Sequence, residues 1–232
     1  MKKTILLIGG SKGIGLEITR LLQSDHKVYV TARSKGELDT DQVNYLKFDV
    51  LKDHIEDLDL PGIIDGLVYL PGSINLKPFK MMKNEIFEKD FQINFMGLVK
   101  TTQALLPKIK KSAQGSIVYF STVAVQKGMP FHTSVAAAKG AIEGFARSLA
   151  AEYAPTVRVN VIAPSLVNTG LANKLLSREK QKEKMDQRHP LQRVGEPEDI
   201  AEMACFLLEK KSSWMTGQVI GVDGGMSSLK IN

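Results

Sequence analysis

Seven short runs rich in apolar and β-branched residues alternate along the chain with longer segments in which apolar residues recur at helical spacing. The short runs are Thr4–Ile8, Lys27–Thr31, Asn44–Phe48, Gly66–Leu70, Gly115–Phe120, Val157–Ile162 and Gln218–Val222. The helical segments are Ile14–Gln23, Phe87–Ile109, Ser134–Tyr153 and Pro197–Leu208. Because crossover helices join parallel strands, this order predicts an α/β fold: a doubly wound parallel sheet of about seven strands with helices on both faces.

The chain of 232 residues is short enough to form one domain, and no repeat, linker or low-complexity tract divides it. Hydrophobic residues make up 43% and charged residues 24%, which are ordinary globular values and exclude a disordered or fibrous chain. We therefore expect a single domain over residues 1–232. Within it, the charged and helical segment 171–189 is expected to form a lid over the substrate site.

The net charge of +6 does not point to a nucleic-acid partner, because basic residues are interleaved with acidic ones, as in Ser177–Arg188. The apolar start Ile5–Ile8 is shorter than the roughly 7–15 residues of a signal peptide core. No apolar stretch approaches the roughly 20 residues of a membrane span. The only cysteine, Cys205, lies in an apolar helical run and is expected to be buried and inert. These features predict a cytoplasmic protein with no membrane or nucleic-acid partner.

The first predicted strand leads directly into a glycine-rich turn, after which a helix begins. Glycines allow a tight turn and close backbone approach to a pyrophosphate, and the helix N-terminus offers unpaired N–H groups to it. The turn lacks the Gly-Lys-Ser/Thr ending of a Walker loop, so the order of strand, turn and helix predicts a Rossmann-type dinucleotide site. The predicted contacts in this turn are Gly9, Ser11, Lys12, Gly13, Ile14 and Gly15.

Blocks spread over nearly the whole chain resemble those of the short-chain dehydrogenase/reductase family, which are single-domain oxidoreductases that use NAD(H) or NADP(H). Gly9, Gly13 and Gly15 match the family glycines, Phe48-Asp49-Val50 its adenine-contacting segment, and Ile93-Asn94-Phe95 the helix with an active-site Asn. Segments 158–169, 190–201 and 216–225 resemble those of carrier-protein ketoreductases, with Ser165 in place of a glycine. The resemblance implies cofactor contacts by Asp49, Val50, Gly72, Lys139, Pro164 and Thr169.

The end of the second predicted strand indicates which dinucleotide is preferred. An Asp at this place would bind the ribose 2′-hydroxyl of NAD and repel a 2′-phosphate, but the chain has Thr31-Ala32-Arg33-Ser34. Arg33 offers a planar fork of donors, and Lys12 in the glycine turn can reach the same region. The cofactor is therefore predicted to be NADP(H), with solvated surface cations as the alternative.

The family resemblance also implies the catalytic residues, and here the chain departs from the pattern. Family members use a tyrosine four residues before a lysine, and a serine about thirteen residues before the tyrosine, as proton donor and carbonyl partner. The lysine position falls on Lys139, the tyrosine position on Val135 and the serine position on Thr122. Asn94 matches the Asn that holds a water beside the lysine. The implied catalytic set is therefore Thr122, Lys139 and Asn94, without a tyrosine.

A second departure is Tyr69-Leu70-Pro71-Gly72, where the family has Asn-Asn-Ala-Gly. Tyr69 is predicted to pack in the core or to replace the lost amide bonds with its hydroxyl, and a displaced proton donor is the remote alternative. Other proton-bearing side chains near the motif are His132, Ser134 and Tyr119; His132 is the best of them as an acid, although an exposed loop position is expected for it. No residue cluster has metal-ligand spacing.

Two functional classes remain. One is an NADP(H)-dependent oxidoreductase that reduces a carbonyl of a small or carrier-bound substrate, weakly or atypically because of Val135. The other is a non-catalytic NADP(H)-binding protein, serving as a redox sensor or partner subunit.

A run of small residues is expected to pair with a symmetry mate beside the segment Phe87–Ile109, giving a homodimer or homotetramer. The run comprises Ala136, Ala137, Ala138, Gly140, Ala141 and Gly144.

Overall fold

The fold was obtained as a computed structural model and is described here for residues 2–230. One parallel sheet contains seven strands in the order β3-β2-β1-β4-β5-β6-β7. The strands are β1 Thr4–Ile8, β2 Lys27–Ala32, β3 Asn44–Lys47, β4 Gly66–Tyr69, β5 Gly115–Phe120, β6 Val157–Pro164 and β7 Val219–Val222. Each predicted strand is present, with its ends displaced by at most two residues, and the predicted fold class is confirmed.

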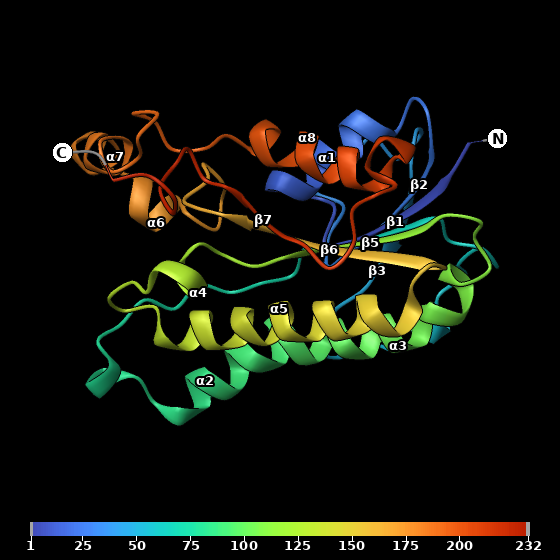
Figure 1. Ribbon diagram of the computed structural model, residues 1–232, viewed down its shortest axis with the longest axis horizontal. Helices are drawn as coiled ribbons and strands as arrows, with labels where there is room; N and C mark the ends of the chain where they lie inside the picture. The colour runs from blue at the N-terminus through green and yellow to red at the C-terminus, as the bar shows by residue number, and fades with distance from the viewer. Residues whose placement is uncertain (1, 231–232) are drawn as a thin grey trace.

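Two layers of helices cover the sheet, as Figure 1 shows: α1 (Gly13–Leu22) and α8 (Pro197–Leu208) on one face, and α3 (Gly97–Ile109) and α5 (Thr133–Tyr153) on the other. Every residue of β4 and β5 is buried, because a parallel sheet at the centre of such a fold meets apolar helices on both sides. The two core clusters accordingly lie on opposite faces of the sheet.

The predicted helix Phe87–Ile109 begins earlier, and it is not uniform. It consists of α2 (Asn84–Phe91), a π-helical turn at Gln92–Met96 and then α3. Sequence periodicity did not reveal the π turn, in which one residue is inserted into the helical repeat. The turn carries the fully buried Asn94, and the Tyr69 hydroxyl donates a hydrogen bond of 2.9 Å to the Ile93 carbonyl within it.

The segments that follow the strands gather at the carboxyl edge of the sheet, at the left of Figure 1. They include α4 (Ala124–Lys127), and α6 (Asn173–Leu176) with α7 (Glu179–Asp186) inside the predicted lid 171–189. The short 3₁₀ helices are Ile55–Asp57, Phe79–Met81 and Lys210–Ser212. Doubly wound sheets bind ligands at this edge, where the strand order reverses between β1 and β4.

None of the helices within residues 2–230 has the length and apolarity needed to cross a bilayer.

Cys205 on α8 is only partly buried, so the prediction of a buried thiol is wrong in degree. Partial burial, together with the nearby carboxylates of Glu202 and Glu209, raises the pKa of the thiol to about 12. The thiol is therefore protonated at neutral pH, which keeps it a poor nucleophile as expected.

Candidate active site

A cavity of about 250 Å³ opens at the carboxyl ends of β1 to β4, at the point where the strand order reverses. Its walls come from the glycine turn, the end of β2, the segment after β3 and the segment after β4. The predicted cofactor residues that line it are Gly9, Ser11, Lys12, Arg33, Asp49, Val50 and Gly72. The structure therefore brings these separate segments together at one cavity.

The glycine turn can be built only from glycine at several positions. Gly9 has a φ of +86° and Gly13 a φ of +53°, both in the left-handed region. A Cβ atom on Gly15 would lie 2.5 Å from the Gly9 carbonyl oxygen, and one on Gly13 would lie 3.2 Å from the Thr169 side chain. The turn thus exposes backbone where a side chain would otherwise stand, at the start of α1. This arrangement fits a bound pyrophosphate.

The end of β2 forms the ribose side of the cavity. Among the described residues, Thr31 Oγ1 is a buried oxygen without a hydrogen-bond partner, and Thr31 lines the cavity together with Ala32 and Arg33. Arg33 and Lys12 are exposed at the rim, and no ion pair between described residues involves either cation. The donors present at this end therefore fit a phosphorylated ribose.

Lys139 lies on α5 and points into the protein. Its Nζ donates a hydrogen bond of 2.9 Å to the Phe120 carbonyl, and only 9% of the residue is exposed. Burial lowers the pKa of the ammonium from 10.5 to about 8. A Cβ on Gly72 would lie 3.5 Å from Lys139 Nζ and 3.1 Å from Asn94 Oδ1. Lys139 and Asn94 therefore meet at Gly72, at the wall of the cavity.

The hydrogen bonds of Asn94 fix the direction of its amide. Asn94 Nδ2 donates to the Asp90 carbonyl at 2.8 Å and to Ser73 Oγ at 3.0 Å. Its Oδ1 accepts from the Ser73 backbone N–H at 3.4 Å, on the side of Gly72 and Lys139. The amide oxygen therefore faces the ammonium, as an acceptor for it or for a water between them.

A buried carboxylate behind Asn94 was missed by the sequence analysis. Asp90 is fully buried and accepts from Ser73 Oγ at 2.5 Å, Asn75 Nδ2 at 2.7 Å and Ser134 Oγ at 2.7 Å. The three donors are neutral and come from the loop after β4 and from α5. Asp90 thereby holds Ser73, whose hydroxyl in turn orients Asn94. The only sequence signal was its place one helical turn before Asn94.

Val135 precedes Lys139 on the same helix, and Thr122 follows Phe120, whose carbonyl accepts from Lys139. Val135 stands one helical turn before Lys139 on α5 and is 5% exposed. Thr122 follows β5 and is partly exposed, and its Oγ1 accepts a hydrogen bond of 3.3 Å from the Ala124 N–H. Pro164 closes β6 beside them, where its carbonyl accepts from the Val123 N–H at 3.1 Å.

The other proton-bearing side chains near the motif are committed elsewhere. Tyr69 is 2% exposed, burial raises the pKa of its phenol, and its hydroxyl donates to the Ile93 carbonyl, so the side chain packs in the core with its proton engaged. Tyr119 is fully buried against Thr102 Oγ1 at 2.7 Å. His132 precedes α5 with its Nδ1 2.7 Å from the Pro130 carbonyl. Ser134 donates to Asp90.

A histidine that sequence reasoning did not single out contacts the residue after Pro164. His189 is 1% exposed, and its Nδ1 lies 2.8 Å from the Met185 carbonyl, which can only accept a hydrogen bond. In the neutral ring Nε2 is therefore an acceptor, and Ser165 Oγ donates to it at 2.9 Å. This pair joins the end of β6 to the segment after α7, within the predicted lid.

Comparison with known proteins agrees with this architecture. The profile of a family described as Enoyl-(Acyl carrier protein) reductase matches residues 9–227. The 3-oxoacyl-[acyl-carrier-protein] reductase FabG of Thermotoga maritima is 33% identical over 241 residues, covering 97% of both chains. The ligand-free aldohexose dehydrogenase of Thermoplasma acidophilum has a TM-score of 0.89 at 25% identity, covering 100% of this chain and 97% of that one. ElxO with NADP bound has the same TM-score and identity, covering 99% and 100%. The chain belongs to the short-chain dehydrogenase/reductase family of oxidoreductases.

Proposed function

We propose that the protein is an NADP(H)-dependent reductase of a carbonyl group on a small or acyl-carrier-bound substrate. The observation that carries the proposal is the position of Lys139 and Asn94 together at Gly72, on the wall of the cavity. At the other end of the same cavity lie Lys12 and Arg33, which form no ion pair with any described residue. The relatives named for acyl-carrier reduction and the fold neighbour that holds NADP support the same assignment.

The residues fit the cofactor segment by segment. The turn Gly9–Gly15 would hold the pyrophosphate, Arg33 and Lys12 the 2′-phosphate, and Asp49 with Val50 the adenine side, as the resemblance implies. Gly72, Pro164 and Thr169 would border the nicotinamide half. When bound, NADPH supplies a hydride to the carbonyl carbon.

The chain's own residues supply binding and orientation at the carbonyl. Thr122 offers a hydroxyl to the carbonyl oxygen, as the serine of the family does. The Lys139 ammonium would bind the nicotinamide ribose, as the resemblance implies, and would place positive charge where the carbonyl oxygen gains negative charge. Asn94 holds the proton pathway next to Lys139 through its fixed amide oxygen. Val135 has no proton to donate, so we infer a weak or atypical rate; a non-catalytic NADP(H)-binding protein is the second candidate.

NADPH is expected to bind at least tenfold more tightly than NADH. One or two charge-assisted hydrogen bonds to the 2′-phosphate, each worth about 1.5–3 kcal/mol, account for this preference. Fluorescence titration of wild type and Arg33→Ala checks it, with the remote and exposed Lys111→Ala as control. Equal affinities in the wild type, or an unchanged NADPH affinity in Arg33→Ala, would refute the assignment.

The protein is expected to form a homodimer or homotetramer through α5 and α3. Gly144 on the outer side of α5 is exposed, and a Cβ there would meet no atom within 4 Å, so a larger side chain fits the single chain. In a helix pair across a twofold axis the same side chain would be repeated and would clash. Light scattering should show an assembly for wild type and a folded monomer for Gly144→Arg. A wild-type monomer at micromolar concentration contradicts the proposal.

We also infer a cytoplasmic location, because the sole cysteine cannot form a disulfide within the chain. The predicted role of residues 171–189 as a lid and the single-domain organisation stay predictions.

A further inference from the structure

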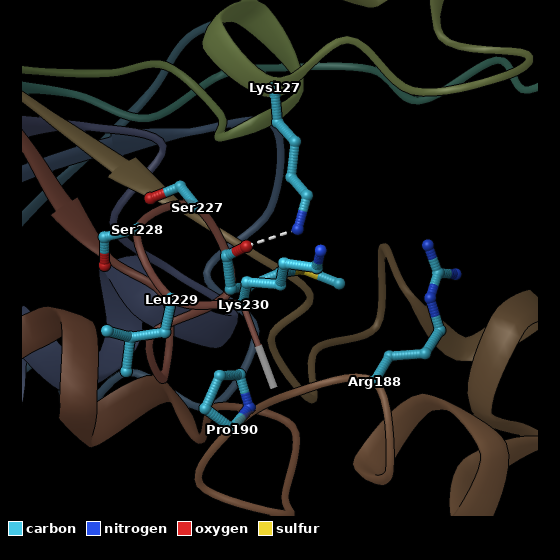
Figure 2. A pocket seen from close by; sticks show the side chains of 8 residues that line it. Lys127, Arg188, Pro190, Ser227, Ser228, Leu229 and Lys230 are labelled. Carbon is cyan, nitrogen blue, oxygen red and sulfur yellow. Dashed lines mark hydrogen bonds between the residues drawn. The ribbon is translucent and has the colours of Figure 1, made fainter. Parts of the chain in front are cut away.

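A second cavity, of about 400 Å³, lies beyond the carboxyl ends of β5, β6 and β7 (Figure 2). Three segments that are distant in sequence form it: the end of α4, the end of the lid segment and the residues after β7. It is lined by Lys127, Arg188, Pro190, Met226, Ser227, Ser228, Leu229 and Lys230. This cavity shares no lining residue with the dinucleotide cavity.

Backbone features hold the chain after β7 in this position. Gly224 and Gly225 have φ values of +62° and +85°, and a Cβ on Gly225 would lie 2.9 Å from the Leu229 side chain and 3.1 Å from Pro190. The Asp223 carboxylate accepts from the Gly225 N–H at 2.8 Å and from the Ser227 N–H at 3.0 Å. Two glycines and one aspartate therefore fold residues 226–230 back over Pro190, which creates the wall of the cavity.

The lining is strongly positive. In Figure 2 Lys127 reaches down from the helix above and Arg188 lies at the right, and Lys230 adds a third cation to the lining. None of the described residues in the lining is acidic, and the Asp223 carboxylate accepts hydrogen bonds from the Ser227 and Gly225 N–H groups. Within residues 2–230, Lys127 Nζ donates to the Met226 carbonyl alone, at 2.5 Å, and an ammonium has three donors. Donors therefore remain for an oxyanion.

The cavity is tied to the reaction centre on two sides. Lys127 ends the helix that begins just after Thr122, so at a helical rise of about 1.5 Å per residue its Cα lies roughly 8 Å from that of Thr122. Arg188 precedes His189, whose ring binds Ser165 at the end of β6. An oxyanion bound in this cavity would therefore lie on the order of 10 Å from a carbonyl bound at Thr122.

We propose that this cavity binds an oxyanion, a carboxylate or phosphoryl group, that belongs to the substrate itself. The inference rests on the proposed carbonyl reduction and narrows its substrate class to small carbonyl compounds with a negative charge about 10 Å from the reacting group. Charge pairing at Lys127 and Arg188 would orient the substrate in a site where Thr122 and Lys139 are the residues proposed to act at the carbonyl oxygen.

A matched pair of ketones tests the inference: 9-oxodecanoate, whose two polar groups have about this separation, and its uncharged methyl ester. With NADPH, we expect kcat/KM for the acid to exceed that for the ester by at least about tenfold, because charge-assisted hydrogen bonds are made only by the acid. In Lys127→Met/Arg188→Met the ratio should fall to near one. Lys111→Met, an exposed lysine before β5, should keep the wild-type ratio. Calorimetry of both ketones with the NADP⁺ complex gives the same comparison as a ratio of Kd values.

The outcomes separate the inference from the function on which it rests. If neither ketone is reduced while NADPH binds, the proposed reduction fails, and the calorimetric ratio still decides whether the cavity holds an oxyanion. Equal binding of acid and ester, binding of neither, or a preference that survives in the double variant overturns the inference. The inference is also overturned if acetoacetyl-CoA is reduced rapidly, the two ketones are not, and the double variant reduces acetoacetyl-CoA at the wild-type rate. That result would indicate a carrier-type substrate.

Discussion

Replacing Val135 with tyrosine is expected to raise the rate of NADPH-dependent carbonyl reduction by about 10²-fold or more, because a positioned general acid contributes about 10²–10⁴-fold. Position 135 lies one helical turn before Lys139, so the two side chains share one face of α5. The Lys139 ammonium would stabilise the phenolate and so lower the pKa of the new tyrosine. Loss of NADPH absorbance with diketones, quinones and β-ketoacyl thioesters measures the rate.

The matched control is Val135→Phe, which carries the same ring without a hydroxyl. Val135 is 5% exposed, so either ring must displace neighbours at a cost of about 1–3 kcal/mol, and thermal unfolding should show a similar loss for both variants. A gain in Val135→Phe as large as in Val135→Tyr would show that the effect is packing and not proton donation. If all three proteins bind NADPH and none reacts, the non-catalytic function is correct.

The sheet could be predicted because its signal is local. Strands such as β4 and β5 are buried on both faces, so each appears in the sequence as a short, mostly apolar run that begins at a glycine. The glycine turn could also be predicted from the sequence, because its geometry excludes side chains; Gly15, for example, has no room for a Cβ. These features depend on neighbours within a few residues, which periodicity and turn chemistry report directly.

The features that escaped prediction depend on contacts between distant segments. Asp90 reads as one more charge on a polar helix, and only the packing of α2 against α5 and the loop after β4 makes it a buried acceptor for three side chains. His189 lies in a charged segment, and its burial requires Ser165, which is 24 residues away in the chain. The oxyanion cavity likewise joins α4 to residues after β7. The π turn at Asn94 was missed because a one-residue insertion barely alters the apolar spacing.

The buried ammonium of Lys139 should make stability and activity change in opposite directions with pH. In the folded protein its pKa is lowered by burial from 10.5 to about 8. Between these two values the unfolded chain holds a proton that the folded protein has lost, so the free energy of unfolding rises with pH across this window. The gain amounts to about 3 kcal/mol at most. Carbonyl reduction, which uses the charged form, should decline as the pH rises through about 8.

Lys139→Met isolates both effects. Urea unfolding at pH values from 7 to 11 should show the wild type gaining about 3 kcal/mol relative to the variant, whereas Lys111→Met, which changes an exposed lysine, should follow the wild type throughout. At pH 7 the variant should lose at least about 10²-fold in kcat/KM, because the charge next to the carbonyl oxygen is gone. An activity that persists in Lys139→Met would remove the lysine from the reaction. A difference in stability that does not change with pH would mean that the pKa of the Lys139 ammonium is not lowered in the folded protein, which would contradict its burial in a dry site.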